Sequence, residues 1–465
     1  MKNKKKSWIW IWGLMFLAWI PGLLAAWPGV FVVDNVFQMK WYLEGTISAH
    51  HPILHTYLLG GCLKLGKQIL GSYEAGVALL AVLQMLFLSF VYAYVLYRLK
   101  DGFGKCRSGK IVWWMVLAYF ALMPYHSISA VTTTKDTIFA GFFLLVVWKT
   151  YEMVKDQKSF FESWKQAVEY VGLVFLMCGF RNTGIYIFLF TLPSMLIVCR
   201  KYWKRVLALG LSVVVLWGIF TGPVYDRLGI TKGSSAEMLC VPIQQLSRVM
   251  VDASEELTEK QQAQVEAYIP DYSKYISAVA DPAKDTFNVQ LFEKDPGRFV
   301  KLWIQVGLKC PVVYVEAFLA TNEGFWNPFA YYPNPDTYLP YIPYHGADLD
   351  QVGISWEHQI FIRQTPVGKG LDWFYEKMTE AGSYNRILLL SLLYSAATAF
   401  WLIVVGIIVC IRKKRYEMAV PFFLLIGLWG TLMLSPVVVF RYGYPLLICL
   451  PVVWAMCCNK TDGKL

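Results

Sequence analysis

Long apolar runs separated by short polar stretches recur from one end of the chain to the other. Each run holds about 20 residues, enough for a helix to cross a hydrocarbon layer about 30 Å thick. The pattern predicts an all-α polytopic membrane protein with about ten transmembrane helices. The expected spans are 8–27, 76–98, 111–126, 136–154, 166–180, 184–199, 206–222, 386–411, 418–436 and 444–458.

These spans divide the chain into three parts. Residues 1–222 are expected to form an N-terminal transmembrane module of seven spans, and residues 386–465 a C-terminal module of three. Residues 223–385 lie between them as an extracytoplasmic segment. The opening MKNKKK with its apolar run could also be a signal peptide. We interpret it as the first span, because it ends in Trp27-Pro28-Gly29 without a small-residue cleavage site.

The polar segments contain helical patterns of their own. The first outer loop, residues 28–75, predicts two interfacial helices, one following Asp34 and one starting near Pro52. In the long segment, Thr258 and Gln261 have the spacing of a capping box. The stretch 299–320 is apolar enough to lie along the membrane.

Composition and charge support this topology. Only 16% of residues are charged, against about 25% in soluble domains, which excludes a soluble enzyme, a coiled coil and a disordered chain. Six clusters between the spans hold 23 of the 43 Lys and Arg residues, whereas residues 223–383 carry 13 basic and 21 acidic residues. Ten spans bring all six clusters to one side, so we expect a bacterial plasma-membrane protein with both termini cytoplasmic. The net charge of +11 therefore needs no nucleic-acid partner.

The ten cysteines include no CxxC pair, and most lie in or beside apolar runs. Cys240 and Cys310 fall in the long polar segment, where a disulfide between them is an open alternative.

Three cations stand out at outer ends of the predicted spans. Arg181 and Arg441 are isolated charges beside the apolar layer, where an arginine is costly unless it is paired or reaches the lipid phosphates. Lys135 follows three threonines at the start of a span and precedes Asp136. A threonine cap with free backbone N–H groups and an ammonium at one place suits an anion such as phosphate. The alternative is a lysine that points into solvent.

Asp34 ends the apolar run that follows the first span. A partly desolvated aspartate has a raised pKa and can act as a base. The competing interpretation is that Asp34 caps the helix that follows it.

The six histidines all fall on the predicted outer side: His50, His51, His55, His126, His345 and His358. The spacing of His51 and His55 would permit metal binding on one helix face, but Pro52 also marks an ordinary helix start and no third ligand is identifiable. No P-loop, dinucleotide fingerprint, GxSxG or HExxH motif is present. The scarcity of ionisable residues deep within spans argues against an ion-coupled transporter.

Taken in order, these features resemble the multi-span glycosyltransferases of the GT-C fold, which include protein O-mannosyltransferases and aminoarabinose transferases. The sequence is most similar to a mainly Gram-positive bacterial branch of that group. The resemblance rests on short segments: Trp27-Pro28-Gly29, Asp34, Gln38, His50-His51-Pro52, Thr134-Lys135-Asp136-Thr137, Arg181-Asn182-Thr183-Gly184, Pro242-Ile243-Gln244-Gln245-Leu246-Ser247-Arg248, Phe325-Trp326 and Arg441-Tyr442.

The resemblance implies transfer of a sugar from a polyprenyl phosphate to an acceptor hydroxyl outside the membrane, with inversion at the anomeric carbon. Asp34 would be the catalytic base, and Lys135, Arg181 and Arg441 would hold the donor phosphate. His51, His126, Asp136, Asn182 and Tyr442 could assist them. Trp326, Tyr331 and Tyr332 could stack on the acceptor, although aromatic residues at a membrane interface are commonly anchors.

Two features depart from the family pattern. Asp34 is followed by Asn35 rather than by a second acid, and no DxD pair is present, so no metal cofactor is expected. The acceptor class stays open among glycan, teichoic acid, lipid and protein. An alternative is a non-enzymatic flippase for lipid-linked sugars or an envelope-assembly partner, which would not need Asp34. Sugar transfer requires the reacting groups to lie close together in space. We therefore expect Asp34 within about 10 Å of at least two of the three cations.

Overall fold

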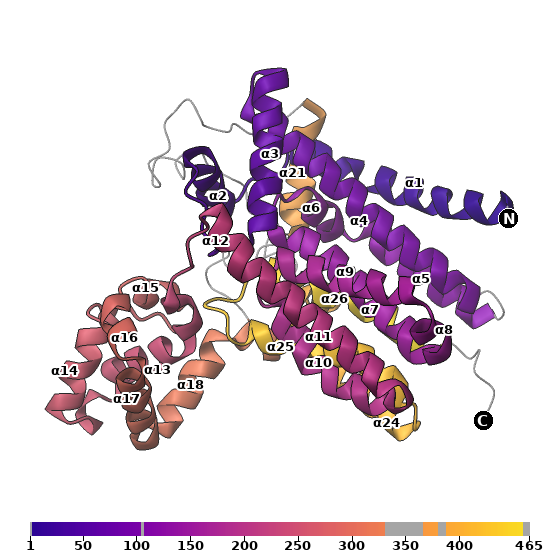
Figure 1. Ribbon diagram of the computed structural model, residues 1–465. Helices are drawn as coiled ribbons and strands as arrows, with labels where there is room; N and C mark the ends of the chain where they lie inside the picture. The colour runs from indigo at the N-terminus through magenta and orange to yellow at the C-terminus, as the bar shows by residue number, and fades with distance from the viewer. Residues whose placement is uncertain (1, 104–106, 331–365, 380–386, 459–465) are drawn as a thin grey trace.

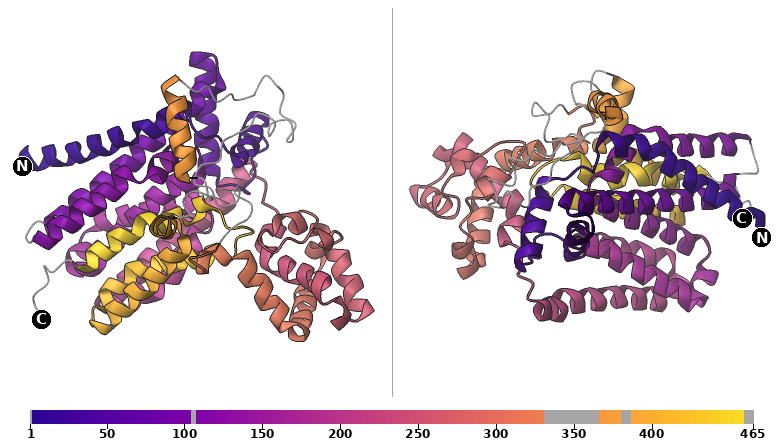
Figure 2. Two further views of the ribbon diagram at one scale, coloured as in Figure 1. Left: turned by 180° about the vertical axis from the view of Figure 1, so that it is seen from behind. Right: turned by 90° about the horizontal axis from the view of Figure 1, so that it is seen from above.

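The computed structural model describes residues 2–103, 107–330, 366–379 and 387–458. These residues form helices and connecting turns, with four isolated backbone bridges and no extended strand among them. Figure 1 shows a bundle of long, roughly parallel helices and a separate group of short helices at one of its ends. Both chain termini lie toward the opposite end of the bundle (Figures 1 and 2).

The bundle is built from apolar helices at both ends of the chain. Its helices are α1 (Lys2–Ala25), α4 (Tyr73–Phe103), α5 (Arg107–Leu122), α6 (Pro124–Val131), α7 (Lys135–Lys155), α9 (Trp164–Phe180), α10 (Gly184–Val198), α11 (Trp203–Ile219), α23 (Leu388–Tyr394), α24 (Ala396–Arg412), α25 (Val420–Leu432) and α26 (Phe440–Cys458). The short α8 (Gln157–Glu162) joins α7 to α9, and α12 (Tyr225–Leu228) follows α11. Helix α21 (Pro366–Thr379) packs against α1.

Each predicted span falls on one helix or on a bent pair of helices, but these positions do not establish how many helices cross the membrane. Among the described residues, five helices are long and apolar enough to cross, or up to eight if each of three bent pairs forms one span. The expected span at 111–126 is bent near its end, by 51° between α5 and α6. Pro124 begins α6 and lacks the N–H that a continuous helix would need. The segment 386–411 is likewise bent, by 78° between α23 and α24.

The first outer loop contains the two expected helices, α2 (Val33–Glu44) and α3 (Ile53–Leu70). Helix α3 follows Pro52 and packs along α4, with Leu59 and Leu63 buried and Lys64 exposed.

The close approach of α3 to α4 depends on two glycines. A Cβ on Gly66 would lie 2.1 Å from the backbone nitrogen of Gly76, and one on Gly76 would lie 2.5 Å from the Cα of Leu63. Only glycine fits such a backbone-to-backbone contact.

The long polar segment folds into what we call the outer unit, residues 235–321. It consists of α13 (Cys240–Asp252), α14 (Glu259–Tyr268), α15 (Asp281–Lys284), α16 (Val289–Lys294), α17 (Pro296–Lys309) and α18 (Pro311–Thr321), and α19 (Glu323–Trp326) follows it. The unit has its own core around Ile243, Leu246 and Val306. The capping box of Thr258 and Gln261 starts α14 as predicted. Cys240 and Cys310 are both buried free thiols.

Candidate functional site

A short backbone pairing brings the first outer loop against the start of α7. The N–H of Val30 donates to the carbonyl of Val131 at 3.0 Å, and the N–H of Thr133 donates to the carbonyl of Val30 at 2.9 Å. The buried Asn35 side chain adds a bond to the carbonyl of Thr133 at 2.6 Å. Gly29 makes the turn possible, because its φ of 143° is strained for any residue with a side chain. As a result, Asp34 faces Lys135.

Asp34 accepts bonds from two cations at one oxygen. Its Oδ2 lies 2.6 Å from Nζ of Lys135 and 3.0 Å from Nη2 of Arg441. The three residues come from α2, α7 and α26, which are far apart in the sequence. The expected convergence of Asp34 with at least two of the three cations is therefore present.

Asp136 is the common ion-pair partner of the two arginines. Its Oδ1 lies 2.8 Å from Nη1 of Arg181, its Oδ2 lies 3.7 Å from Nε of Arg441, and its side chain is 1% exposed. Arg181 ends α9 and Arg441 lies in the first turn of α26, so Asp136 joins three helices. We call Asp34, Lys135, Asp136, Arg181 and Arg441 the charge cluster.

Tyr442 lies against both arginines of the charge cluster. The guanidinium carbon of Arg181 is 5.0 Å from the ring centroid of Tyr442, and that of Arg441 is 5.3 Å away. Cation–π contacts of this kind hold a guanidinium plane in a fixed orientation. Arg181 and Arg441 are therefore held by Asp136 and by the ring of Tyr442.

His51 closes the side of the cluster nearest the first outer loop. Its Nδ1 accepts a bond of 3.4 Å from Nζ of Lys135, and its ring packs against Trp41. Burial and the adjacent Lys135 charge lower the pKa of His51 well below its ordinary value, so the ring is neutral and able to accept. Asn182 supports the loop by donating to the carbonyl of Ala49 at 3.1 Å.

His55 has a different hydrogen-bond partner from His51. Its Nδ1 lies 3.0 Å from Oε1 of Gln38, and Gln38 donates in turn to Thr56 at 2.8 Å. Burial and the charge of Lys135 lower the pKa of His55 to about 3, which keeps it neutral. Among the described residues, no group of three or more His, Cys, Asp or Glu side chains is arranged to hold a metal ion.

The predicted rise in the pKa of Asp34 is wrong. Burial does raise the pKa of this carboxyl, but the charges of Arg441 and Lys135 outweigh it and hold the net pKa well below its ordinary value. The charge cluster carries three cations and two carboxylates, so its net charge is +1. In this state Asp34 is a firmly ionised partner of two cations and a weak base.

The structure also corrects four simpler interpretations. Asp34 does not cap α2, because the N-cap position is Val32 and no side-chain capping bond is made. Thr134 precedes α7 without capping it. Lys135 does not point into solvent, since its side chain is 13% exposed and paired. Arg181 and Arg441 are ion-paired with Asp136 rather than extended toward lipid.

His126 lies apart from the charge cluster, within a helix of the bundle. It belongs to α6 and is fully buried among aromatic rings, with Nδ1 at 3.1 Å from the hydroxyl of Tyr444. Tyr444 lines a small cavity of about 20 Å³ together with Asp136 and Arg441 of the charge cluster. Any effect of His126 on the cluster would therefore pass through Tyr444.

Of the predicted acceptor residues, the structure describes Trp326, and its side-chain and carbonyl hydrogen bonds go to residues outside the charge cluster. Trp326 donates to the carbonyl of Leu319 at 2.9 Å, and its own carbonyl accepts from Trp401 of α24 at 2.8 Å. Its contacts fix α19 on α24. Tyr331 and Tyr332 lie outside the described residues, as do His345 and His358.

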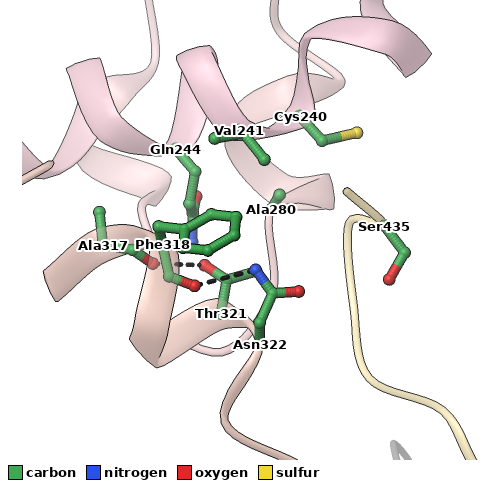
Figure 3. Close-up of a pocket in the computed structure, with 9 residues that line it drawn as sticks. All are labelled: Cys240, Val241, Gln244, Ala280, Ala317, Phe318, Thr321, Asn322 and Ser435. Carbon is green, nitrogen blue, oxygen red and sulfur yellow. Dashed lines mark hydrogen bonds between the residues drawn. The ribbon is translucent and has the colours of Figure 1, made fainter. Parts of the chain in front are cut away.

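The outer unit and the connection that leads into it from α12 are each tied by a backbone hydrogen bond to a loop of the site. The N–H of Ala49 donates to the carbonyl of Thr231 at 2.8 Å, beside His51, and the N–H of Ala280 donates to the carbonyl of Pro436 at 2.8 Å, four residues before Phe440. The second tie lies at a cleft between α13, α18 and the loop that carries Ser435 (Figure 3).

Within this junction, Gln244 holds the turn that contains Ala280. Its Nε2 donates to the carbonyl of Ile276 at 2.6 Å, while Thr321 donates to the carbonyl of Ser277 at 3.1 Å. The neighbouring Gln245 accepts from Trp303 at 2.8 Å and donates to the carbonyl of Tyr314 at 3.1 Å. Gln244 and Gln245, which belong to one of the segments that carry the family resemblance, thus hold parts of the outer unit together.

Sequence reasoning found the charged residues but missed their supports. Asn35 and Gln38 join the loop elements around Asp34 and His55, and Asp136 has a larger part than expected as the common partner of both arginines. Polar side chains within helices otherwise rich in apolar residues were the available signal for Asn35 and Gln38.

Comparison with known proteins identifies one protein family. The family model is described as a family of unknown function (DUF6020), and it matches residues 41–464. No curated protein and no solved structure matches the chain.

Proposed function

We propose that this chain, which belongs to the DUF6020 family of unknown function, is an integral membrane glycosyltransferase. The proposed reaction moves a sugar from a polyprenyl-phosphate donor to an acceptor hydroxyl on the outer face of the plasma membrane, with inversion at the anomeric carbon. The acceptor would be a cell-envelope glycan, teichoic acid, lipid or protein. The proposal needs no metal cofactor.

The observation that supports this proposal best is the placement of Asp34 between two cations. Oδ2 of Asp34 lies 2.6 Å from Lys135 and 3.0 Å from Arg441. A site that only held phosphate would need the cations but no second carboxylate beside them. A transferase needs both, because one group must receive a proton where another stabilises the departing phosphate.

Charge balance suggests how a donor would enter. A sugar linked to a lipid through one phosphate is a diester with a single negative charge, which matches the net charge of +1 of the cluster. Its phosphate oxygens would replace Asp34 as partners of Lys135 and Arg441. Asp136 would stay in place and keep the two arginines oriented.

This exchange would turn Asp34 into a base. Once its two cations face the phosphate, the interactions that hold down the pKa of Asp34 weaken, while its burial remains. The acceptor hydroxyl then gives its proton to Asp34, and its oxygen bonds to the anomeric carbon. The bond from that carbon to the phosphate oxygen breaks, and the electron pair leaves with the lipid phosphate toward Lys135, Arg441 and Arg181.

The test is sugar transfer in membranes that contain the full chain, supplied with radiolabelled polyprenyl-phosphate sugars. We expect wild type to transfer, and Asp34→Asn to bind donor but to lose transfer by a factor of about 10² to 10⁴. Asp271→Asn is a matched control, because Asp271 pairs with Lys274 on the surface of the outer unit. It should transfer at the wild-type rate.

Two results would contradict the proposal. Donor binding without transfer of any sugar by wild type would favour the flippase or assembly partner. Normal transfer by Asp34→Asn would remove Asp34 from the chemistry and leave the cations as the only assigned groups.

A further inference from the structure

Helices α17 and α18 of the outer unit meet at a sharp elbow with an apolar outer side. Their axes are bent by 106° where Cys310 joins them. Leu308 and Val312, which flank this joint, are 79% and 67% exposed. One apolar row continues along each arm from there, formed by Val300 and Ile304 on α17 and by Val315 and Leu319 on α18.

The exposed apolar row cannot be buried within the outer unit, because the opposite faces of α17 and α18 already pack against the core of that unit. Leu302, Val306 and Tyr314 belong to the core of the outer unit. Gly307 lets the Tyr314 ring approach so closely that a Cβ there would lie 2.6 Å from it. The hydroxyl of Tyr314 then donates to the carbonyl of Trp303 at 2.8 Å, which fixes the two arms to each other.

The elbow is also apolar enough to compare with helices of the bundle. Together α17 and α18 satisfy the length and hydropathy expected of a membrane span, but the bend prevents them from crossing as one rod. The bundle helix α11 exposes side chains in the same way, with Leu211 at 65% and Val215 at 48%. The elbow belongs to the group of helices at the end of the bundle where α2 and α12 lie (Figure 1).

Basic residues flank the α17 arm of the apolar row. Arg298, Lys301 and Lys309 are exposed on α17, and the sequence of this helix contains no Asp or Glu. Long basic side chains beside an apolar row are typical of helices at a membrane interface, where they reach the lipid phosphates. A surface for a soluble acidic partner would not need six exposed aliphatic residues.

We propose that the elbow of α17 and α18 inserts its tip, Leu308 and Val312, into the outer lipid surface beside the bundle. The outer unit is then anchored twice, by its chain connections and by lipid. This inference does not depend on the proposed glycosyl transfer, because it concerns only where the outer unit rests.

Photocrosslinking of the full chain tests this contact. Leu308→p-benzoyl-L-phenylalanine would be reconstituted in vesicles of phosphatidylethanolamine and phosphatidylglycerol, irradiated and analysed by mass spectrometry. The same substitution of Leu211 on α11 provides the lipid-facing reference, and that of Lys260 on α14 provides a solvent-facing control, since both positions are exposed. All three side chains lie on surfaces, so none of the substitutions disturbs a core.

We expect phospholipid adducts at position 308 at a yield close to that at 211 and roughly tenfold above that at 260. Adducts of position 308 with protein, whether a second copy or another part of the same chain, would overturn the inference. So would the absence of lipid adducts at 308 in vesicles where 211 reacts.

Discussion

In the charge cluster, each carboxylate forms ion pairs with two cations. Asp34 joins Lys135 and Arg441, and Asp136 joins Arg441 and Arg181. Arg441 is therefore the only cation of the cluster with both carboxylates as partners. A ligand phosphate that competes for Arg441 changes the environment of Asp34 directly.

The pH dependence of turnover follows from this competition. In the free protein, Arg441 and Lys135 hold the pKa of Asp34 well below its ordinary value. With donor bound, the phosphate neutralises these cations and the pKa of Asp34 rises. We expect the acidic limb of kcat, which reports the donor complex, to lie at higher pH than the acidic limb of kcat/KM, which reports the free protein. Steady-state rates measured across pH in wild type check this order, and coincident limbs would contradict the exchange of partners.

Stability should depend on Asp136 more than on any exposed acid. Its side chain is 1% exposed, and its removal leaves Arg181 and Arg441 without their shared anion. We expect Asp136→Asn to lower the free energy of unfolding by about 3 kcal/mol. In the surface pair of Asp271 with Lys274, both side chains are at least half exposed, so Asp271→Asn should cost less than about 0.5 kcal/mol. Unfolding in mixed micelles measures both, and equal losses would refute the assignment.

The sequence predicted which residues are costly in a membrane, but not how they are paired. Isolated charges beside apolar runs identified Arg181 and Arg441, because desolvation depends on local composition. The direction of the pKa shift of Asp34 depends instead on partners 101 and 407 positions away in the chain. No local pattern contains that information, so the predicted shift had the wrong sign.

At the scale of helices, apolar runs predicted the positions of the bundle elements, and prolines and glycines set their breaks and contacts. Pro124 and Pro311 each begin a new helix after a bend. Both prolines were visible in the sequence, but whether a proline kinks a helix or ends it depends on what packs beside it. The backbone contact of α3 with α4 could not be predicted either. A glycine in a helix allows a close contact, but its position in the sequence does not say which other helix makes that contact.

Gly66 and Gly61 of α3 provide a matched pair of substitutions. A methyl group at position 66 would overlap the backbone of Gly76, whereas one at position 61 meets nothing within 4 Å. We expect Gly66→Ala to push α3 away from α4 and to lower stability by about 1–3 kcal/mol. Gly61→Ala should raise stability by up to about 1 kcal/mol, because alanine favours the helix. Thermal unfolding in detergent distinguishes the two, and the same sign for both would contradict the observed packing.

The junction of the outer unit with the loop before α26 predicts an effect at a distance. Gln244 holds the carbonyl of Ile276, and the turn that follows pairs with Pro436 ahead of Arg441. We expect Gln244→Leu to weaken binding of the polyprenyl-phosphate donor by roughly tenfold, equivalent to about 1.4 kcal/mol, because Arg441 loses its fixed position.

Gln262→Leu is the control for this prediction. Gln262 makes a similar bond within the outer unit, to the carbonyl of Ser254 at 2.6 Å, but it does not contact the turn that holds Ala280. Both variants leave one carbonyl without its donor and should lose comparable stability. If the two variants weaken donor binding equally, Gln244 affects donor binding only through the stability of the protein, and the prediction that it positions Arg441 is wrong.

For the whole molecule, the distribution of basic residues predicts the orientation in the membrane. Lys413 lies just beyond α24, and both termini lie toward the same end of the bundle. Lys232 lies in the connection between α12 and the outer unit at the other end. Because basic clusters are retained in the cytoplasm, Lys413 should face the cytoplasm and Lys232 the exterior.

Labelling of single introduced cysteines with a membrane-impermeant maleimide tests this orientation in intact cells. We expect Lys232→Cys to react at once and Lys413→Cys to react only after permeabilisation. The parent chain gives the background, which should be low because seven of the eight free cysteines described in the structure are buried. The reverse order of labelling would place the charge cluster on the cytoplasmic side. A donor sugar would then have to be supplied from the cytoplasm, and the outer-face reaction proposed for Asp34 would be excluded.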